Sequence, residues 1–163
     1  MRIYTYLLMS YIHWPPRKKV LIKALDKIFK QFPGKNLRIV DIGSGPGLLA
    51  KAIQGKGVDY LGIDNDPDTI KYCNKLFGNL SESTFSNINI TDSEFQFKEN
   101  DIIILSGAVH HLNDKVLSDF LEKASRGFAL IICDHAREKL IGKSQLIPSV
   151  LQRLHRGKYI RPY

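Results

Sequence analysis

A glycine-rich turn led by an acidic residue is the part of this sequence that most clearly suggests chemistry. Three glycines stand at alternate positions of the chain: Gly43, Gly45 and Gly47. They follow Asp41, which closes the apolar run 37–40. Glycine allows backbone angles that a Cβ forbids, and it lets a ligand lie against the main chain. Pro46 suits the first position of a helix, so we predict a strand, a turn and a helix whose N-terminus faces a bound small molecule.

The spacing of these glycines separates two classes of nucleotide ligand. The dinucleotide fingerprint G-x-G-x-x-G needs a third glycine where this chain has Leu48. The carboxylate of Asp41 would repel a pyrophosphate, and it favours a cationic or amine-bearing ligand. NAD is therefore a weak candidate, and a purely structural turn before a helix is the simplest alternative.

The stretch from Asp41 to Gly47 resembles the first motif of the class I S-adenosylmethionine-dependent methyltransferases, in which an acidic residue precedes G-x-G-x-G. The resemblance implies S-adenosylmethionine as the cofactor. It also implies which residues of this motif hold the cofactor: Asp41, Gly43, Ser44, Gly45 and Gly47.

A second acidic residue, Asp64, ends the apolar stretch 58–63, and its distance of roughly twenty residues from the glycine turn suits a carboxylate that binds ribose hydroxyls. In the methyltransferase family the matching acid has that role. The resemblance therefore places Asp64 on the ribose and Asn65 beside the adenine. Asp64 does not separate S-adenosylmethionine from NAD, because both ligands carry a ribose. The alternative is that Asp64 only shapes its own turn.

The adenine contact is expected in the segment 85–92, where the family places an acid at the end of its third strand. Asn89, followed by the apolar Ile90, keeps the order found in the family, whereas Asp92 has the matching charge. An asparagine keeps an acceptor oxygen but carries no charge. Both residues therefore remain candidates for this contact.

The apolar run 101–105 is typical of a strand buried on both faces. By resemblance, the backbone near Ser106 and Gly107 lies along the methionine part of the cofactor. His110 and His111 would then lie near the methyl-transfer pocket. Imidazole titrates near neutral pH, so either histidine is a candidate base if the acceptor needs one. The alternative is a pair of turn residues that only satisfy local hydrogen bonds.

The composition limits what kind of protein this is. With 163 residues, 44% of them hydrophobic, the chain is expected to form one domain with a substantial core. Two cysteines and the lack of a secretory signal favour a cytoplasmic location. No run approaches the roughly 18 apolar residues of a membrane span. No cluster of histidines and cysteines indicates a metal site.

The net charge of +8 is unevenly distributed. Residues 1–38 carry nine Lys or Arg against one acid, and residues 137–163 carry seven against one. Residues 39–136 carry eight basic residues against fourteen acidic ones. The basic flanks could recruit RNA or an anionic substrate. The alternative is a solvated helix face, because the lysines between positions 18 and 30 fall mainly between apolar residues at helical spacing.

The order of the expected elements predicts an α/β protein. Strands are expected at 37–42, 58–63, 84–90, 101–106 and 128–133, and helices at 17–32, 46–54, 67–77, 113–126 and near 143–155. This alternation predicts a Rossmann-like, doubly wound, mainly parallel sheet. We expect one methyltransferase-like domain over 1–163, with an N-terminal segment and helix (1–36), a cofactor-binding core (37–134) and a basic C-terminal helix and tail (135–163).

The family normally adds two antiparallel strands after its fifth strand. Here only a helix and a basic tail are expected there, so the fold should be C-terminally truncated relative to the seven-stranded methyltransferase fold. The strand 128–133 would then form an exposed sheet edge, which could pair with a second copy in a homo-oligomer. Three functions stay open: a methyltransferase acting on a small molecule, an RNA methyltransferase, and a non-catalytic S-adenosylmethionine-binding or assembly domain.

Overall fold

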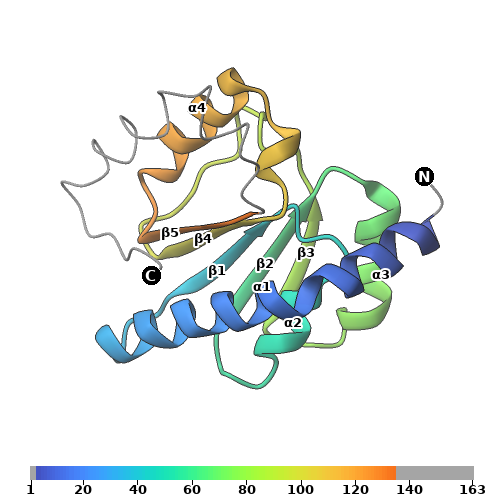
Figure 1. The fold of residues 1–163 in the computed structure, drawn as a ribbon. Coiled ribbons are helices and arrows are strands. Elements are labelled where there is room, and N and C mark those ends of the chain that lie inside the picture. Colours follow the sequence, from blue (N-terminus) through green and yellow to red (C-terminus); the bar gives the residue numbers. More distant parts are fainter. Residues whose placement is uncertain (1–2, 135–163) are drawn as a thin grey trace.

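The computed structural model describes residues 3–134 of the chain, which form a five-stranded parallel sheet with helices on both faces (Figure 1). The strand order is β3-β2-β1-β4-β5. The strand bounds are β1 Arg38–Ile42, β2 Asp59–Asp64, β3 Ser83–Asn87, β4 Asp101–Ser106 and β5 Ala129–Cys133. The chain moves from the centre to one edge and then returns to the other side of β1, which confirms the predicted doubly wound sheet. The helix expected near 143–155 and the basic tail lie outside the described residues.

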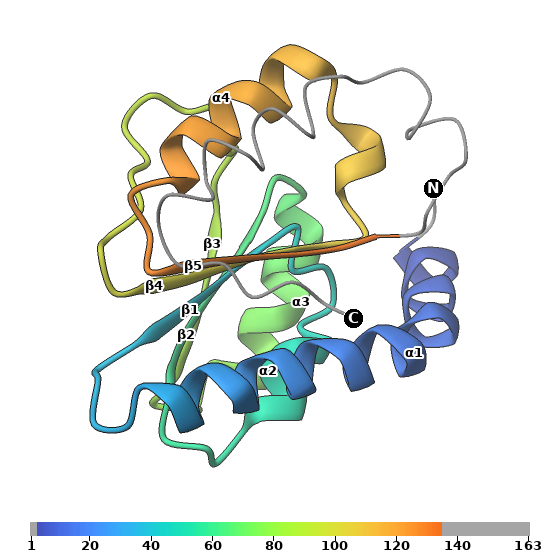
Figure 2. The same ribbon diagram turned by 60° about the vertical axis from the view of Figure 1, so that its left-hand side comes forward.

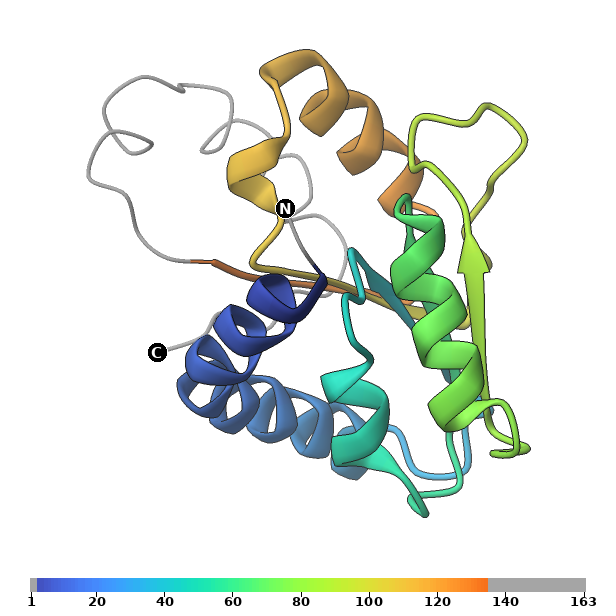
Figure 3. The same cartoon turned by 90° about the vertical axis from the view of Figure 1, so that its right-hand side faces the viewer.

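The helices lie on both faces of the sheet. Their bounds are α1 Ile3–Gln31, α2 Leu48–Ile53, α3 Pro67–Phe77 and α4 Asp114–Ala124, with a short 3-10 helix, η1, at Val109–His111. Figures 2 and 3 show α4 on the opposite side of the sheet from α1 and α2. Right-handed crossovers that leave the centre of the sheet in opposite directions place their helices on opposite faces.

Alternate residues of the central strands supply two separate cores. Ile39 and Ile104 pack beneath α1, α2 and α3, whereas Val40 and Ile103 pack beneath α4. All four side chains are fully buried. Because β4 is covered on both faces, residues 102–105 form a continuous apolar run, as predicted.

Helix α1 is longer than the sequence predicts. The expected helix covers 17–32, but α1 begins at Ile3 and continues through Pro15 and Pro16. A proline removes one amide donor and crowds the preceding turn, so it bends a helix where packing holds both sides together. Figure 2 shows the first turns of α1 running in a different direction from the rest of the helix. Three core residues anchor the second part: Leu21, Leu25 and Ile28.

Helix α2 begins at Leu48, two residues later than predicted. Gly47 precedes it with a left-handed φ of 72°, so Pro46 belongs to the turn and not to the first helical position. A Cβ at position 47 would also lie 2.7 Å from the ring of Phe77. Only glycine satisfies both conditions, because it has no Cβ and tolerates positive φ.

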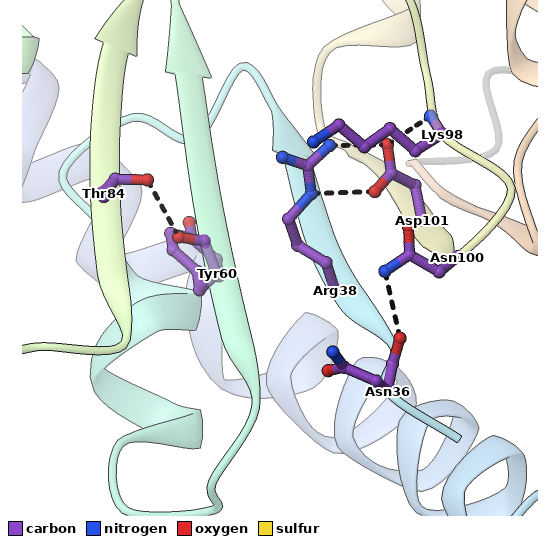
Figure 4. Close-up of polar contacts among 7 residues, drawn as sticks. All are labelled: Asn36, Arg38, Tyr60, Thr84, Lys98, Asn100 and Asp101. Carbon is purple, nitrogen blue, oxygen red and sulfur yellow. Dashed lines mark hydrogen bonds and ion pairs between the residues drawn. The ribbon is translucent and has the colours of Figure 1, made fainter.

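An ion pair joins the amino ends of the two central strands, β1 and β4 (Figure 4). The glycine turn lies at the opposite end of these strands. Arg38 donates from Nε and Nη2 to the two carboxylate oxygens of Asp101, at 2.8 and 2.9 Å. The backbone N–H of Lys98 donates to the same carboxylate at 2.8 Å. Asp101 is fully buried, so its charge depends on these donors. The pair holds the two central strands together away from the carboxyl ends, where the predicted site residues lie.

Strand β5 forms one edge of the sheet. It pairs with β4, and within residues 3–134 no strand pairs with its outer side. Phe128, which the sequence predicts as the start of this strand, lies just before it and packs edge to face on Phe32, with ring centroids 5.0 Å apart. Ile132 on β5 is 39% exposed. Pairing of a second copy along this edge stays a prediction.

Candidate functional site

The glycine turn folds over the carboxyl end of the neighbouring strand. The backbone N–H groups of Gly43 and Ser44 both donate to the carbonyl oxygen of Ile63, at 2.8 and 3.0 Å. Gly43 and Gly45 have φ values of 68° and 52°, which a residue with a Cβ rarely adopts. The turn thus presents bare backbone at the carboxyl ends of β1 and β2, as the sequence predicts.

Asp64 is fixed directly onto this turn. One of its carboxylate oxygens accepts the backbone N–H of Gly45 at 3.0 Å, and the other accepts that of Asp66 at 3.0 Å. The side-chain amide of Asn87 on β3 donates to the carbonyl oxygen of Asp64 at 2.9 Å. Asn65 follows as an exposed residue. The carboxylate is therefore oriented at the tip of β2, because both of its oxygens are held by backbone donors.

Asp41 is a buried carboxylate beneath the same turn. It is 4% exposed, and the hydroxyl of Tyr60 donates to its Oδ2 at 2.7 Å. Burial raises the pKa of Asp41 from 3.8 to about 7; the Tyr60 hydrogen bond opposes this rise, and the charge of Asp64 adds to it. A cation beside Asp41 would favour its ionised form. The site is therefore suited to a ligand with a positive charge.

A cavity of about 190 Å³ opens between α1, the glycine turn and the end of β4. Its polar and aromatic lining comes from six side chains: Ser10, Trp14, Arg17, Asp41, Ser44 and Ser106. The hydroxyl oxygen of Ser44 is buried without a hydrogen-bond partner among the described residues. Buried polar atoms are rarely left unpaired, so this hydroxyl points to a ligand with polar groups.

Only part of the predicted site lines this cavity. Five predicted site residues do: Asp41, Gly43, Ser44, Gly45 and Ser106. Gly47 faces the rings of Phe77 and Phe85, and Asp64 lies beyond the turn, so neither is in the cavity wall. The volume is below the roughly 300–1,000 Å³ of a pocket for a drug-sized ligand. The cavity is therefore too small to hold a whole nucleoside ligand.

The two candidates for the adenine contact share one turn. Strand β3 ends at Asn87 and not at position 90 as predicted. Asn89 accepts the backbone N–H of Thr91 at 3.1 Å, and Asp92 accepts that of Asn89 at 3.2 Å. Asn and Asp side chains that bond neighbouring amides compete with strand pairing, which explains the early end of β3.

A lysine on α4 holds this turn in place. The Nζ of Lys123 donates to the carbonyl oxygens of Ile90 and Asp92, at 3.3 and 2.7 Å. The turn with both candidates is therefore fixed between β3 and α4. Which of the two side chains contacts adenine stays a prediction.

The histidines lie in η1, directly after β4. His111 is exposed and does not line the cavity beneath α1. The side chain of His110 lies outside the part of the chain that the structure describes. A role for either histidine as a base stays a prediction.

Sequence reasoning missed three residues: Ser10 and Arg17, which line the cavity, and Tyr60, which donates to Asp41. Tyr60 carried a usable signal, because a tyrosine inside a buried strand needs a partner for its hydroxyl. Ser10 and Arg17 carried none, since the sequence predicts a helix that begins only at position 17. Within residues 3–134 no three His, Cys, Asp or Glu side chains are placed to hold a metal ion. In the same range, no helix has the length and apolar character to cross a membrane.

A comparison with protein families points to the same cofactor as the geometry of the site. A family model described as "Methyltransferase domain" matches residues 39–129, which is more than half of the chain. The chain belongs to the class I S-adenosylmethionine-dependent methyltransferases. The matched range contains β1 to α4 with both acidic residues of the site, and S-adenosylmethionine is the cofactor of this family.

Two curated proteins of Leptospira interrogans are similar to this methyltransferase domain. Each is named "Uncharacterized RNA methyltransferase" and is 28% identical, over 118 residues in the strain Fiocruz L1-130 and over 117 in the strain 56601. The aligned region covers 69% and 68% of this chain but only 28% of each relative. The chain thus spans less than a third of the length of these relatives.

Solved structures share the fold. The plantazolicin methyltransferase BpumL, solved with S-adenosylhomocysteine (SAH) and a desmethyl plantazolicin analog, has a TM-score of 0.64 at 19% identity, covering 94% of this chain and 62% of that one. The PH0226 protein of Pyrococcus horikoshii OT3 has a TM-score of 0.63 at 18% identity, covering 86% and 61%. At this identity the likeness shows the fold alone.

Proposed function

We propose that this domain binds S-adenosylmethionine at the carboxyl ends of β1, β2 and β4 and transfers its methyl group to a small-molecule acceptor. The observation that carries the proposal is the hydrogen bond from the Gly45 N–H to Asp64, with the buried Asp41 beneath the same turn. Two carboxylates and a bare backbone turn together suit a ligand that has both a ribose and a positive charge. The Ser44 hydroxyl, which has no hydrogen-bond partner within residues 3–134, supports the same fit.

Each site residue has a proposed part in holding the cofactor. Asp41 accepts the ammonium of the methionyl group, and Asp64 accepts the ribose hydroxyls with lone pairs that its backbone donors leave available. The remaining contacts are assigned to the glycine turn, the strand ends and the turn that follows β3: Gly43, Ser44, Gly45, Gly47, Asn65, Asn89, Ile90, Asp92 and Ser106. The turn fixed by Lys123 presents Asn89 or Asp92 to the adenine amino group.

The protein's part in the reaction is mainly positioning. When bound, S-adenosylmethionine supplies an electrophilic methyl group on its sulfonium. The chain must hold the acceptor in line with that group and exclude water, which α1 favours by covering the cavity with Trp14 and Leu21. His111 or His110 takes the proton if the acceptor is a hydroxyl or a protonated amine.

Isothermal titration calorimetry with S-adenosylmethionine, SAH and NAD tests this proposal. We expect the first two ligands to bind and NAD not to bind. Asp41→Ala and Asp64→Ala should each weaken binding of both, since each removes a charge-assisted contact. Asp59→Ala is the matched control, because Asp59 is an exposed acid at the other end of β2. Unchanged affinity in both site variants would refute the assignment; binding without transfer to any acceptor would favour a non-catalytic binding domain.

A second candidate function, an RNA methyltransferase, rests on the outer face of α1. Four exposed lysines repeat there at intervals of four, four and three residues: Lys19, Lys23, Lys27 and Lys30. Residues at these intervals share one helix face. Asp26, on the same helix, is paired with Lys56 at 3.0 Å. Such a row of lysines suits an RNA backbone, and the Leptospira relatives are named as RNA methyltransferases.

Salt dependence of RNA binding distinguishes this candidate. Replacing the four lysines by glutamine should weaken RNA binding and flatten the plot of log affinity against log salt, by about 0.7 for each lost phosphate contact on a single strand. Replacing Lys51, Lys71, Lys75 and Lys115, which are exposed on α2, α3 and α4, is the matched control with the same loss of charge. If both sets of replacements weakened RNA binding equally, the protein would attract RNA only through its net charge, and the RNA methyltransferase candidate would fail.

A further inference from the structure

Helix α1 brings a positive charge to the cofactor cavity. Arg17 lines this cavity, and its guanidinium lies directly over the backbone of Gly107, just after β4. A Cβ at position 107 would overlap Nη1 of Arg17 and would lie 3.1 Å from its Cζ. Gly107 also has a φ of 69°. The missing side chain at this position therefore makes the room in which the guanidinium sits.

The same cavity thus contains one anionic and one cationic side chain. Asp41 reaches it from β1, and Arg17 reaches it from α1. The methionyl end of S-adenosylmethionine carries an ammonium and a carboxylate, whose charges match this pair. A guanidinium binds a carboxylate with two parallel hydrogen bonds, which a lysine cannot reproduce.

We infer that Arg17 binds the methionyl carboxylate and makes this domain selective for cofactors that carry one. The inference rests on the proposed function, in which Asp41 takes the ammonium at the same end of the ligand. It also gives the long N-terminal helix a specific role. Because Arg17 lies one turn beyond Trp14 and just after the two prolines, the bent helix places both side chains over the cavity.

A purely structural role is the competing explanation for Arg17. Its guanidinium lies close enough to Cys133, at the end of β5, to oppose the rise that burial causes in the pKa of that thiol. Asp134 follows Cys133 and acts on the thiol in the opposite direction. Arg17 could therefore only steady the end of β5. A test must separate loss of selectivity from loss of structure.

Decarboxylated S-adenosylmethionine provides this separation, because it keeps the adenosine, the sulfonium and the ammonium but lacks the carboxylate. Calorimetry on the full chain would compare its affinity with that of S-adenosylmethionine. We expect the wild type to prefer S-adenosylmethionine by roughly 10- to 100-fold, the range of a charge-assisted hydrogen bond. Arg17→Ala should bring this ratio close to one by weakening S-adenosylmethionine alone. Arg17→Lys should keep part of the ratio, and Lys18→Ala, an exposed neighbour, should keep all of it.

Gly107→Ala supplies a second route to the same result, because its Cβ would displace the guanidinium while Arg17 stays in the sequence. The ratio of the two affinities is measured within each variant, so a change in stability alone does not alter it. An unchanged ratio in Arg17→Ala, or a wild type that binds both ligands equally, would overturn the inference and leave the cofactor assignment intact. A wild type that binds neither ligand would overturn the proposed function as well.

Discussion

Replacing the buried acid of the first strand should stabilise the ligand-free protein and weaken cofactor binding at the same time. Asp41 is 4% exposed, and burial raises its pKa from 3.8 to about 7. The folded state therefore holds the Asp41 proton more tightly than the unfolded state does. Asp41→Asn removes this titration, keeps the shape of the side chain and leaves an oxygen that accepts the Tyr60 hydroxyl.

The sign and size of the effect follow from linkage. Because the folded state binds more protons between pH 4 and 7, the free energy of unfolding of the wild type falls as the pH rises through this window and stays low above it. A rise in pKa from 3.8 to about 7, at roughly 1.4 kcal/mol for each pH unit, corresponds to about 4 kcal/mol as an upper bound. Asp41→Asn does not have this cost. Its free energy of unfolding should therefore equal that of the wild type near pH 4 and exceed it most at pH 8.

Urea unfolding of the ligand-free wild type and Asp41→Asn, followed by circular dichroism from pH 4 to pH 9, measures this difference. Asp59→Asn is the control, since Asp59 is exposed on the same sheet. At one fixed concentration, S-adenosylmethionine should stabilise the wild type more than Asp41→Asn. An advantage of Asp41→Asn that is independent of pH, or a loss of its stability at pH 8, would refute the reasoning.

Three further substitutions probe the frame around the site. Tyr60→Phe removes the donor that lowers the pKa of Asp41, so it should cost about 2 kcal/mol above pH 7 and less near pH 5, measured by urea unfolding at both pH values. Arg38→Ala leaves the buried Asp101 without its guanidinium, so it should lower the free energy of unfolding by about 3 kcal/mol in thermal or urea unfolding. Its cofactor affinity in calorimetry should stay unchanged, because the ion pair lies at the amino ends of the strands; a change in affinity would contradict this. Gly47→Ala should cost on the order of 2 kcal/mol, because its Cβ meets an aromatic ring and its φ is positive; Gly55→Ala, with a similar φ and open space around it, isolates the backbone part of that cost.

The sheet is predictable from the sequence because its signals are local. The acid-led glycine turn and the apolar runs of β1 and β4 fix which segments are strands and where the chain turns. Parallel pairing then brings the strand ends together, so the sequence alone places Asp41 and Asp64 at one site. The strand boundaries are less predictable, because Asn89 and Asp92 end β3 through side-chain hydrogen bonds that no periodicity reveals.

The α1 side of the site is not predictable from the sequence, for a physical reason. Pro15 and Pro16 normally end a helix, and only packing across the sheet shows that α1 continues through them. By its sequence position Arg17 is a basic residue at a helix start, although it lies over Gly107 in the cavity. Likewise, nothing local couples Tyr60 to Asp41, since the two meet only through the pairing of neighbouring strands.

A crystal structure of this chain with S-adenosylhomocysteine tests the central claim most directly. We predict the ribose hydroxyls on Asp64, the ammonium at Asp41, and the methionyl end in the cavity beneath α1. Ligand density at any other place, or a glycine turn that makes no contact with the ligand, would contradict this account.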